Sequence, residues 1–203
     1  MMLSIALAGS FILSYLFTLF FRYLALRYGI LDRPDSSVKL HKKATPYLGG
    51  PAFILASFTA TLLYALFSSY NIPRQEGILL IGGGIMMITG VVDDVKKIRP
   101  RTKFIIQTLT AAGIVLLGIR LDIFFLPLWA NLALTLLWIV GVTNAFNLID
   151  IMDGLCGGIA AIAAFFLFFS NGDGNLFLLF LSASLAAFLI FNFPPARLFM
   201  GDA

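Results

Sequence analysis

Charged residues are absent from seven long stretches of the chain, and apolar residues fill these stretches without the alternation typical of a half-buried strand. A run of about 20 apolar residues is long enough to cross the hydrocarbon core of a membrane as an α-helix. The pattern therefore predicts an all-α, polytopic membrane protein with about seven transmembrane helices. The charge-free runs are 1–21, 44–73, 77–92, 104–119, 123–149, 154–172 and 174–196.

Basic residues collect in alternate loops. With Met1 placed outside, the loops 22–43, 93–103 and 150–153 and the C-terminal end face the cytoplasm. They hold twelve of the 14 Lys and Arg residues, which leaves only Arg74 and Arg120 on the opposite side. Short cytoplasmic loops carry such an excess of Lys and Arg. We therefore expect a multi-pass protein of the cell membrane with its N-terminus outside.

Composition narrows the class further. The chain is 60% hydrophobic and 12% charged, whereas soluble domains are about 45–50% apolar and about 25% charged. This excludes a soluble domain, a disordered chain and a nucleic-acid module. One cysteine, Cys156, lies beside two glycines in an apolar run, which favours a buried packing role. Residues 1–203 show no internal repeat or linker, so we expect a single membrane domain.

Most acidic residues fall on the predicted cytoplasmic side, and none falls at a predicted bilayer midplane. This placement indicates a site at the cytoplasmic interface rather than a conduction path, because ionisable groups within a membrane mark such paths. The acidic residues on that side are Asp32, Asp35, Asp93, Asp94, Asp150, Asp153 and Asp202.

The first candidate motif is Asp93-Asp94-Val95-Lys96-Lys97, which ends the third run. Asp93 and Lys97 are four residues apart and can share a helix face, so an interfacial ion pair is the simpler interpretation. Two adjacent aspartates at headgroup depth are costly without a partner. We therefore favour a functional role at the depth of a lipid phosphate.

The second motif places polar groups at every third position, from Asn144 and Asn147 to Asp150 and Asp153, before Gly154. On a helix, the first three share one face. Hydrogen bonds between helices are the alternative explanation. Strict spacing at the cytoplasmic face favours a ligand, with the helix ending near Gly154.

Two further segments complete the cytoplasmic side. Phe199-Met200-Gly201-Asp202 presents a carboxylate after a glycine that allows close backbone approach. The first loop carries His41, the only histidine, together with Lys43 and, further on, Gly49-Gly50. Basic residues at 96–103, including Lys103, can anchor anionic lipids or hold phosphates. Gly82-Gly83-Gly84 lies within a run, where helix packing is the better interpretation.

These side chains share one chemistry. Carboxylate and amide oxygens without a Cys/His cluster suit Mg²⁺, or Mn²⁺, which bind through one or two carboxylates plus substrate phosphates. Nearby Lys and Arg neutralise such phosphates. The reaction class that fits is phosphoryl transfer at the membrane face.

The motifs resemble those of the polyprenyl-phosphate N-acetylhexosamine-1-phosphate transferases. Asp93, Asp94 and Lys97 match the family's Asp-Asp-x-x-Lys signature. The segment from Asn144 to Gly154 matches Asn-x-x-Asn-x-x-Asp-x-x-Asp-Gly, and Phe199 to Asp202 match Phe-Met-Gly-Asp. The first loop is more similar to the N-acetylglucosamine-1-phosphate branch than to the muramoyl-pentapeptide branch.

The resemblance implies a reaction in which a polyprenyl phosphate attacks a UDP-N-acetylhexosamine, giving a lipid-diphosphate-sugar and UMP. It implies that Asp202 is the Mg²⁺ ligand and that Asp93 and Asp94 handle the lipid phosphate, one as a candidate base. With Lys97 these form the expected catalytic set. The expected substrate-binding set is Asn144, Asn147, Asp150, Asp153, Phe199, Lys103, Lys43 and His41, with Phe199 stacked on uracil.

The family pattern continues beyond Gly-Asp through further spans to a His-rich loop, so we expect the 203-residue chain to be a truncated and impaired member. A membrane transporter and a noncatalytic membrane scaffold are the alternative functions. The sugar, the polyprenol, the mechanism of displacement and a homodimeric state are left open.

Overall fold

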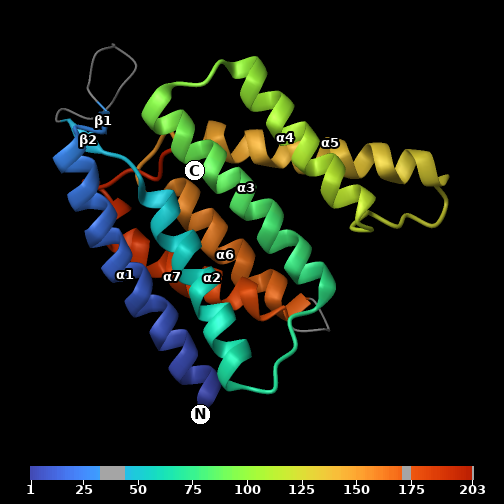
Figure 1. Ribbon diagram of the computed structural model, residues 1–203, viewed down its shortest axis with the longest axis horizontal. Coiled ribbons are helices and arrows are strands. Elements are labelled where there is room, and N and C mark those ends of the chain that lie inside the picture. The colour runs from blue at the N-terminus through green and yellow to red at the C-terminus, as the bar shows by residue number, and fades with distance from the viewer. Residues whose placement is uncertain (33–43, 171–174, 203) are drawn as a thin grey trace.

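A computed structural model describes residues 1–32, 44–170 and 175–202. These residues form seven α-helices and one small sheet (Figure 1), which confirms the all-α class. The helices are α1 Met2–Tyr28, α2 Gly49–Phe67, α3 Arg74–Lys96, α4 Pro100–Leu116, α5 Leu128–Ile149, α6 Leu155–Ser170 and α7 Leu176–Asn192. Strand β1, Leu31–Asp32, pairs antiparallel with strand β2, Thr45–Pro46.

Four of these helices, α1, α2, α3 and α5, are long and apolar enough to cross a membrane. The apolar helices α6 and α7 have 16 and 17 residues, and α4 has 17. Helices α1, α3 and α4 extend past their charge-free runs into charged residues, whereas the other four runs are longer than their helices because loop residues are uncharged too. Run 44–73, for example, yields a helix of 19 residues.

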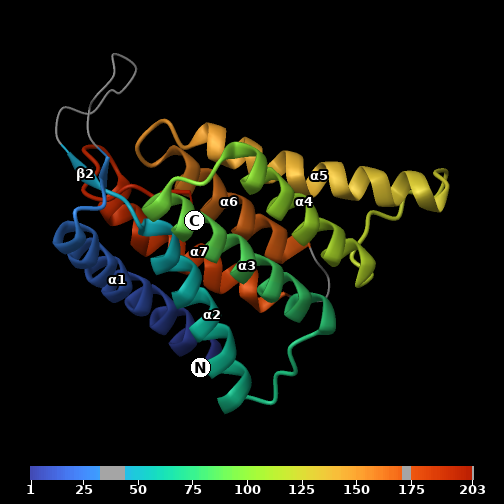
Figure 2. The ribbon, with the colours of Figure 1, turned by 45° about the horizontal axis from the view of Figure 1, so that its top comes forward.

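A bundle of α1, α2, α6 and α7 forms the body of the protein, in which α1 packs against α2 and α7, and α7 also contacts α2 and α6 (Figures 1 and 2). Small polar residues join α1 to α7. The Ser10 hydroxyl donates to the Phe180 carbonyl over 2.9 Å, and the Ser14 hydroxyl donates to the Ser184 carbonyl over 2.6 Å. Small residues let backbones approach closely, and such hydrogen bonds hold membrane helices together.

Helices α3, α4 and α5 extend this body sideways, and α5 projects well beyond it in both views (Figures 1 and 2). Helix α3 packs against α4, and α4 packs against α5. A side chain at Gly82 would collide with the Ile114 side chain on α4, so the helix-packing interpretation of Gly82 is confirmed.

The main apolar core lies between α2, α6 and α7 and continues into the segment after α7. Phe188 and Leu185 of α7 are buried together with Leu198 and Met200 of that segment. Cys156 is 3% exposed in the same core, which confirms its packing role. This core fixes the position of residues 198–202, which carry the third motif.

The opposite end of the molecule holds a buried acid. Glu76, in the first turn of α3, is 1% exposed, and the Tyr70 hydroxyl donates to its Oε2 atom over 2.6 Å.

Candidate active site

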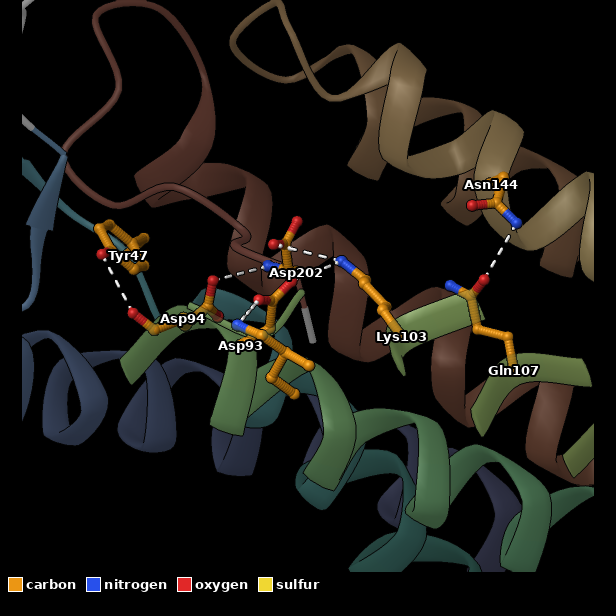
Figure 3. A network of polar contacts seen from close by, with 8 residues as sticks. Tyr47, Asp93, Asp94, Lys103, Gln107, Asn144 and Asp202 are labelled. Atoms are coloured by element: carbon orange, nitrogen blue, oxygen red, sulfur yellow. Dashed lines mark hydrogen bonds and ion pairs between the residues drawn. The ribbon is translucent and has the colours of Figure 1, made fainter. Parts of the chain in front are cut away.

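The candidate motifs meet at one end of the molecule. There α3 ends and α4 begins, α5 ends and α6 begins, and the segment after α7 crosses between them. The β2–α2 connection reaches the same place, because the Tyr47 hydroxyl donates to the Asp94 carbonyl over 3.2 Å. Figure 3 shows this convergence, with Tyr47, Asp94, Asp202 and Lys103 arranged in a row.

Asp93 and Asp202 share one ammonium group. The Lys103 Nζ atom lies 3.0 Å from Asp93 Oδ2 and 3.2 Å from Asp202 Oδ2 (Figure 3). The second oxygen of Asp93 accepts the Ile98 amide over 2.7 Å. Burial and hydrogen bonding with Asp93 raise the pKa of Asp202, while Lys103 opposes the rise. Charged partners of this kind make stronger hydrogen bonds than neutral ones.

Asp94 has a different role from its neighbour. Its Oδ1 atom accepts the backbone amide of Asp202 over 3.0 Å, so it holds the segment that carries the third motif. Its Oδ2 atom is buried and has no hydrogen-bond partner within the described residues. Gly201, at φ +80°, lies directly against this carboxylate, and a side chain there would collide with it.

The segment that carries Asp202 is also anchored to the start of α2. The amides of Gly49 and Gly50 donate to the carbonyls of Phe199 and Met200 over 3.0 and 2.7 Å. In return the Phe199 amide donates to the Pro46 carbonyl over 2.9 Å. The first amides of a helix need partners, and at α2 these are backbone carbonyls of the third motif.

The second motif does not stay on one helix. Helix α5 ends at Ile149, so Asp150 and Asp153 lie in the turn before α6, and the expected helix end near Gly154 was placed too late. Asp153 Oδ2 accepts the Ala196 amide over 2.9 Å and thereby fixes the loop after α7. Gly154 adopts φ 76°, which suits a glycine at this turn.

Asn144 is separated from the acidic residues. Its side-chain amide donates to Gln107 Oε1 over 3.0 Å and to the Val140 carbonyl over 2.8 Å (Figure 3). It therefore joins α5 to α4, as the alternative explanation of this motif anticipated. Asp150 caps the same helix, since its amide donates to the Phe146 carbonyl over 3.2 Å, whereas Asp153 lies beyond the helix end.

A cleft of about 740 Å³ opens between these elements. Burial raises the pKa of Asp150, which lines the cleft, to about 7, and the negative charges of Asp202 and Asp153 add to the rise. The cleft is lined by Asp32, Tyr47, Asp93, Asp94, Lys97, Asn147, Asp150, Ile151, Met152, Asp153, Asn192, Pro194, Phe199, Gly201 and Asp202. Most of the expected site residues thus face one space.

A second cleft of about 810 Å³ lies alongside, between α4 and α5. Asp93 and Asn147 line both clefts, whereas Lys103, Arg101 and Asn144 line the second. Its remaining lining is largely apolar, from Phe104, Ile105, Ile98 and Leu148. A charged cleft and an apolar one therefore meet at Asp93.

The structure differs from the sequence analysis at Lys97. Helix α3 ends at Lys96, and Lys97 caps it at φ 53°, its amide donating to the Asp93 carbonyl over 2.8 Å, but the ion pair expected between the two side chains does not form. Asp93 is paired with Lys103, ten positions along the chain. Lys97 still lines the first cleft. His41 and Lys43 lie outside the described residues.

Two residues at the site were missed. Tyr47 contacts Asp94, and Asn192 joins two site segments, because its Oδ1 accepts the Gly154 amide and its Nδ2 donates to the Leu198 carbonyl, each over 3.0 Å. Asn192 is 2% exposed. The sequence did contain a signal for Asn192, because it is a polar residue near the end of an apolar run, two positions before Pro194.

The carboxylates at the site suit a hard divalent cation. Asp93 and Asp202 already hold one cationic group between them, and a buried oxygen of Asp94 is close by. Among the described residues there is no cluster of three or more His, Cys, Asp or Glu side chains that forms a metal cage. This donor set fits Mg²⁺, which binds through few carboxylates and completes its shell with waters and phosphates.

Comparison with known proteins identifies the family to which the chain belongs. Residues 77–203 match the glycosyl transferase family 4 profile. The chain is 35% identical over 192 residues, 88% of its length, to a probable undecaprenyl-phosphate N-acetylglucosaminyl 1-phosphate transferase of Bacillus subtilis, covering 52% of that protein.

Two other relatives are similar. A phospho-N-acetylmuramoyl-pentapeptide-transferase of Lactobacillus delbrueckii is 36% identical over 83% of this chain and 60% of its own. A decaprenyl-phosphate N-acetylglucosaminephosphotransferase of Mycolicibacterium smegmatis is 28% identical over 95% and 54%. The chain thus spans about half the length of the curated relatives it matches. The matched residues include all three motifs described above, and the chain belongs to glycosyl transferase family 4.

Proposed function

We propose that this protein transfers N-acetylglucosamine 1-phosphate from UDP-N-acetylglucosamine to a polyprenyl phosphate. The observation that carries the proposal is the placement of Asp93 and Asp202, bridged by Lys103, at a cleft that Asp150 also lines. The names of the Bacillus and Mycolicibacterium relatives favour N-acetylglucosamine over a muramoyl peptide.

In this reaction an oxygen of the lipid phosphate attacks the β-phosphorus of the UDP-sugar. A new phosphorus–oxygen bond joins lipid and sugar phosphate, and the bond from the β-phosphorus to the bridging oxygen breaks to release UMP. Catalysis of such a transfer is mostly positioning and charge stabilisation. The bonds formed and broken in this transfer balance without a covalent intermediate on the protein and without a further co-reactant.

We assign a role to each site residue from the charge of its side chain. Asp202, with Asp93 beside it, is the proposed holder of Mg²⁺, which neutralises the diphosphate when bound. Lys103 and Lys97 supply positive charge for phosphates, and Asn147, Asp150, Asp153 and Phe199 line the space for the nucleotide-sugar. Asp94 positions the Asp202 backbone through the hydrogen bond to its amide.

The neighbouring cleft suits the lipid. Its apolar lining from α4 and α5 ends at Asp93, so a polyprenyl chain placed there would bring its phosphate to the charged cleft. Lys103 and Arg101 stand at this junction and match an anionic headgroup.

We also propose that all seven helices span the membrane, with the active end in the cytoplasm. Consecutive helices run alternately toward and away from the site, because the site gathers the end of one and the start of the next. The basic residues at 96–103 and Arg197 lie at this end, whereas Arg74, the first residue of α3, and Arg120, in the connection between α4 and α5, lie at the other. The positive-inside rule then assigns the active end to the cytoplasm.

The test is reconstitution of the purified protein with undecaprenyl phosphate, UDP-N-acetylglucosamine and Mg²⁺, with UMP release as the readout. Asp202→Asn should lower the rate by about 100-fold or more, the usual cost of removing one charge-stabilising group. Asp122→Asn is the matched control, since Asp122 is exposed and far from the site in sequence and structure.

Equal rates for the two variants would remove Asp202 from the mechanism. Solute transport by the wild-type protein without UMP formation would instead support a transporter. Faster transfer from the UDP-muramoyl-pentapeptide than from UDP-N-acetylglucosamine would contradict the proposed sugar substrate but support the proposed class of reaction.

A further inference from the structure

Lys103 occupies the position between Asp93 and Asp202 in which a bridging divalent cation would bind. Its ammonium lies within 3.2 Å of both carboxylates, which come from α3 and from the segment after α7. Asp93 is 9% exposed, and the Lys103 side chain is 17% exposed. The Lys103–Asp93 pair is therefore largely shielded from water, and its charge interaction is stronger than that of a pair at the surface. The side chain of Asp202 is 46% exposed, so its contact with Lys103 is the more open of the two.

The local charge balance requires such a cation. Asp93, Asp94 and Asp202 converge, and one oxygen of Asp94 is buried and unpaired within the described residues. Without Lys103, the carboxylates of Asp93 and Asp202 would repel each other at close range. Lys103 thus keeps them together in the protein without metal.

The carboxylate oxygens of Asp93 and Asp202 cannot bind the Lys103 ammonium and Mg²⁺ equally closely at the same time. Mg²⁺ binds carboxylate oxygens at about 2.0–2.1 Å, and an ammonium on the same Asp202 Oδ2 would then stand next to the doubly charged ion. Lys103 has room to leave, because its side chain lines the second cleft together with Arg101 and Asn147. In that cleft its charge can meet an incoming phosphate.

We propose that Lys103 is an internal substitute for the divalent cation, which holds Asp93 and Asp202 in place, must release Asp202 when the metal binds, and then turns toward the phosphate of the substrate. This inference rests on the proposed metal site at Asp202. Lys103 acts on the metal through the carboxylates, so with respect to the metal it is a positioning residue.

The test measures Mn²⁺ binding without substrate, from the electron paramagnetic resonance signal of free Mn²⁺. Lys103→Met should bind Mn²⁺ about tenfold more tightly than the wild type, a change of about 1.4 kcal/mol, because a competing cation is removed. Lys96→Met, which removes an exposed charge that lines neither cleft, should leave the Mn²⁺ affinity within about twofold.

UMP release adds a second readout. Lys103→Met should combine tighter Mn²⁺ binding with slower UMP release, since the same side chain is needed for the phosphate. Unchanged or weaker Mn²⁺ binding by this variant would overturn the inference, while leaving the proposed reaction intact. A wild-type protein that binds no Mn²⁺ would overturn the metal site and the inference together.

A labelling experiment on the wild-type protein avoids dependence on the folding of the variant. Mn²⁺ should raise the rate of acetylation of Lys103 by an amine-reactive reagent, followed by mass spectrometry, and should leave that of Lys96 unchanged. Equal Lys103 labelling with and without Mn²⁺ would refute release of the ammonium.

Discussion

Gly201 is the residue at which a single added carbon should disturb the site most. At φ +80° an alanine costs about 1–2 kcal/mol in backbone strain. Its Cβ would also stand 3.1 Å from the Asp94 carboxyl carbon, with one oxygen nearer still, so the Asp94 carboxylate has to move.

The movement of Asp94 has its own cost. Its hydrogen bond from the Asp202 amide, 3.0 Å long, involves a charged acceptor and is worth about 1.5–3 kcal/mol. Together with the backbone strain, Gly201→Ala should destabilise the protein by about 3–5 kcal/mol. Displacement of Asp202 by about 1 Å should lower the rate of UMP release by about 100-fold.

Gly118→Ala provides the matched control. Gly118 has φ +102°, but no atom lies within 4 Å of its potential Cβ position, so this variant carries backbone strain alone. Thermal denaturation in detergent and UMP release should therefore separate the two glycines. If Gly201→Ala had the same melting temperature as Gly118→Ala and released UMP at the wild-type rate, the assigned role of Asp94 would be refuted.

Two further variants test the frame of the site. Asn192→Leu removes both hydrogen bonds of a buried amide, to Gly154 and Leu198, and should cost about 2–5 kcal/mol in thermal unfolding experiments; an unchanged melting temperature would contradict this role. The pKa of Asp150 is raised from 3.8 to about 7, so the folded protein binds its proton more tightly than the unfolded chain, and stability should fall as pH rises through this interval. Asp150→Asn should flatten that dependence and melt above the wild type at pH 8, whereas parallel melting curves from pH 5 to pH 8 would exclude the effect.

The helices were predictable because charges interrupt the chain only near helix ends. The lengths of the helices were not, since residues 68–73 and 123–127 belong to charge-free runs yet form connections. Whether α4, α6 and α7 are long enough to span a membrane depends on where the connections that flank each of them begin and end, which composition does not reveal.

Within the site, the motif residues were predictable as a group but their pairings were not. Lys97 ends α3 in a left-handed conformation, and the chain then turns at Pro100, so the partner of Asp93 is Lys103 on the next helix. Helix periodicity relates only residues on one helix. Adjacent positions such as Asp93 and Asp94 point about 100° apart, and only tertiary packing decides which of them holds the Asp202 backbone.

The hydrogen bonds between the start of α2 and the Phe199–Met200 backbone have a consequence for biosynthesis. The two partners are roughly 150 residues apart in the chain, a long separation for a contact that shapes a site. All seven helices precede residue 199 in the chain, so they are synthesised before this contact can form. A nascent chain that lacks residue 199 therefore has no assembled site, and ribosome stalling before this residue would leave helices whose acidic motifs are not yet joined.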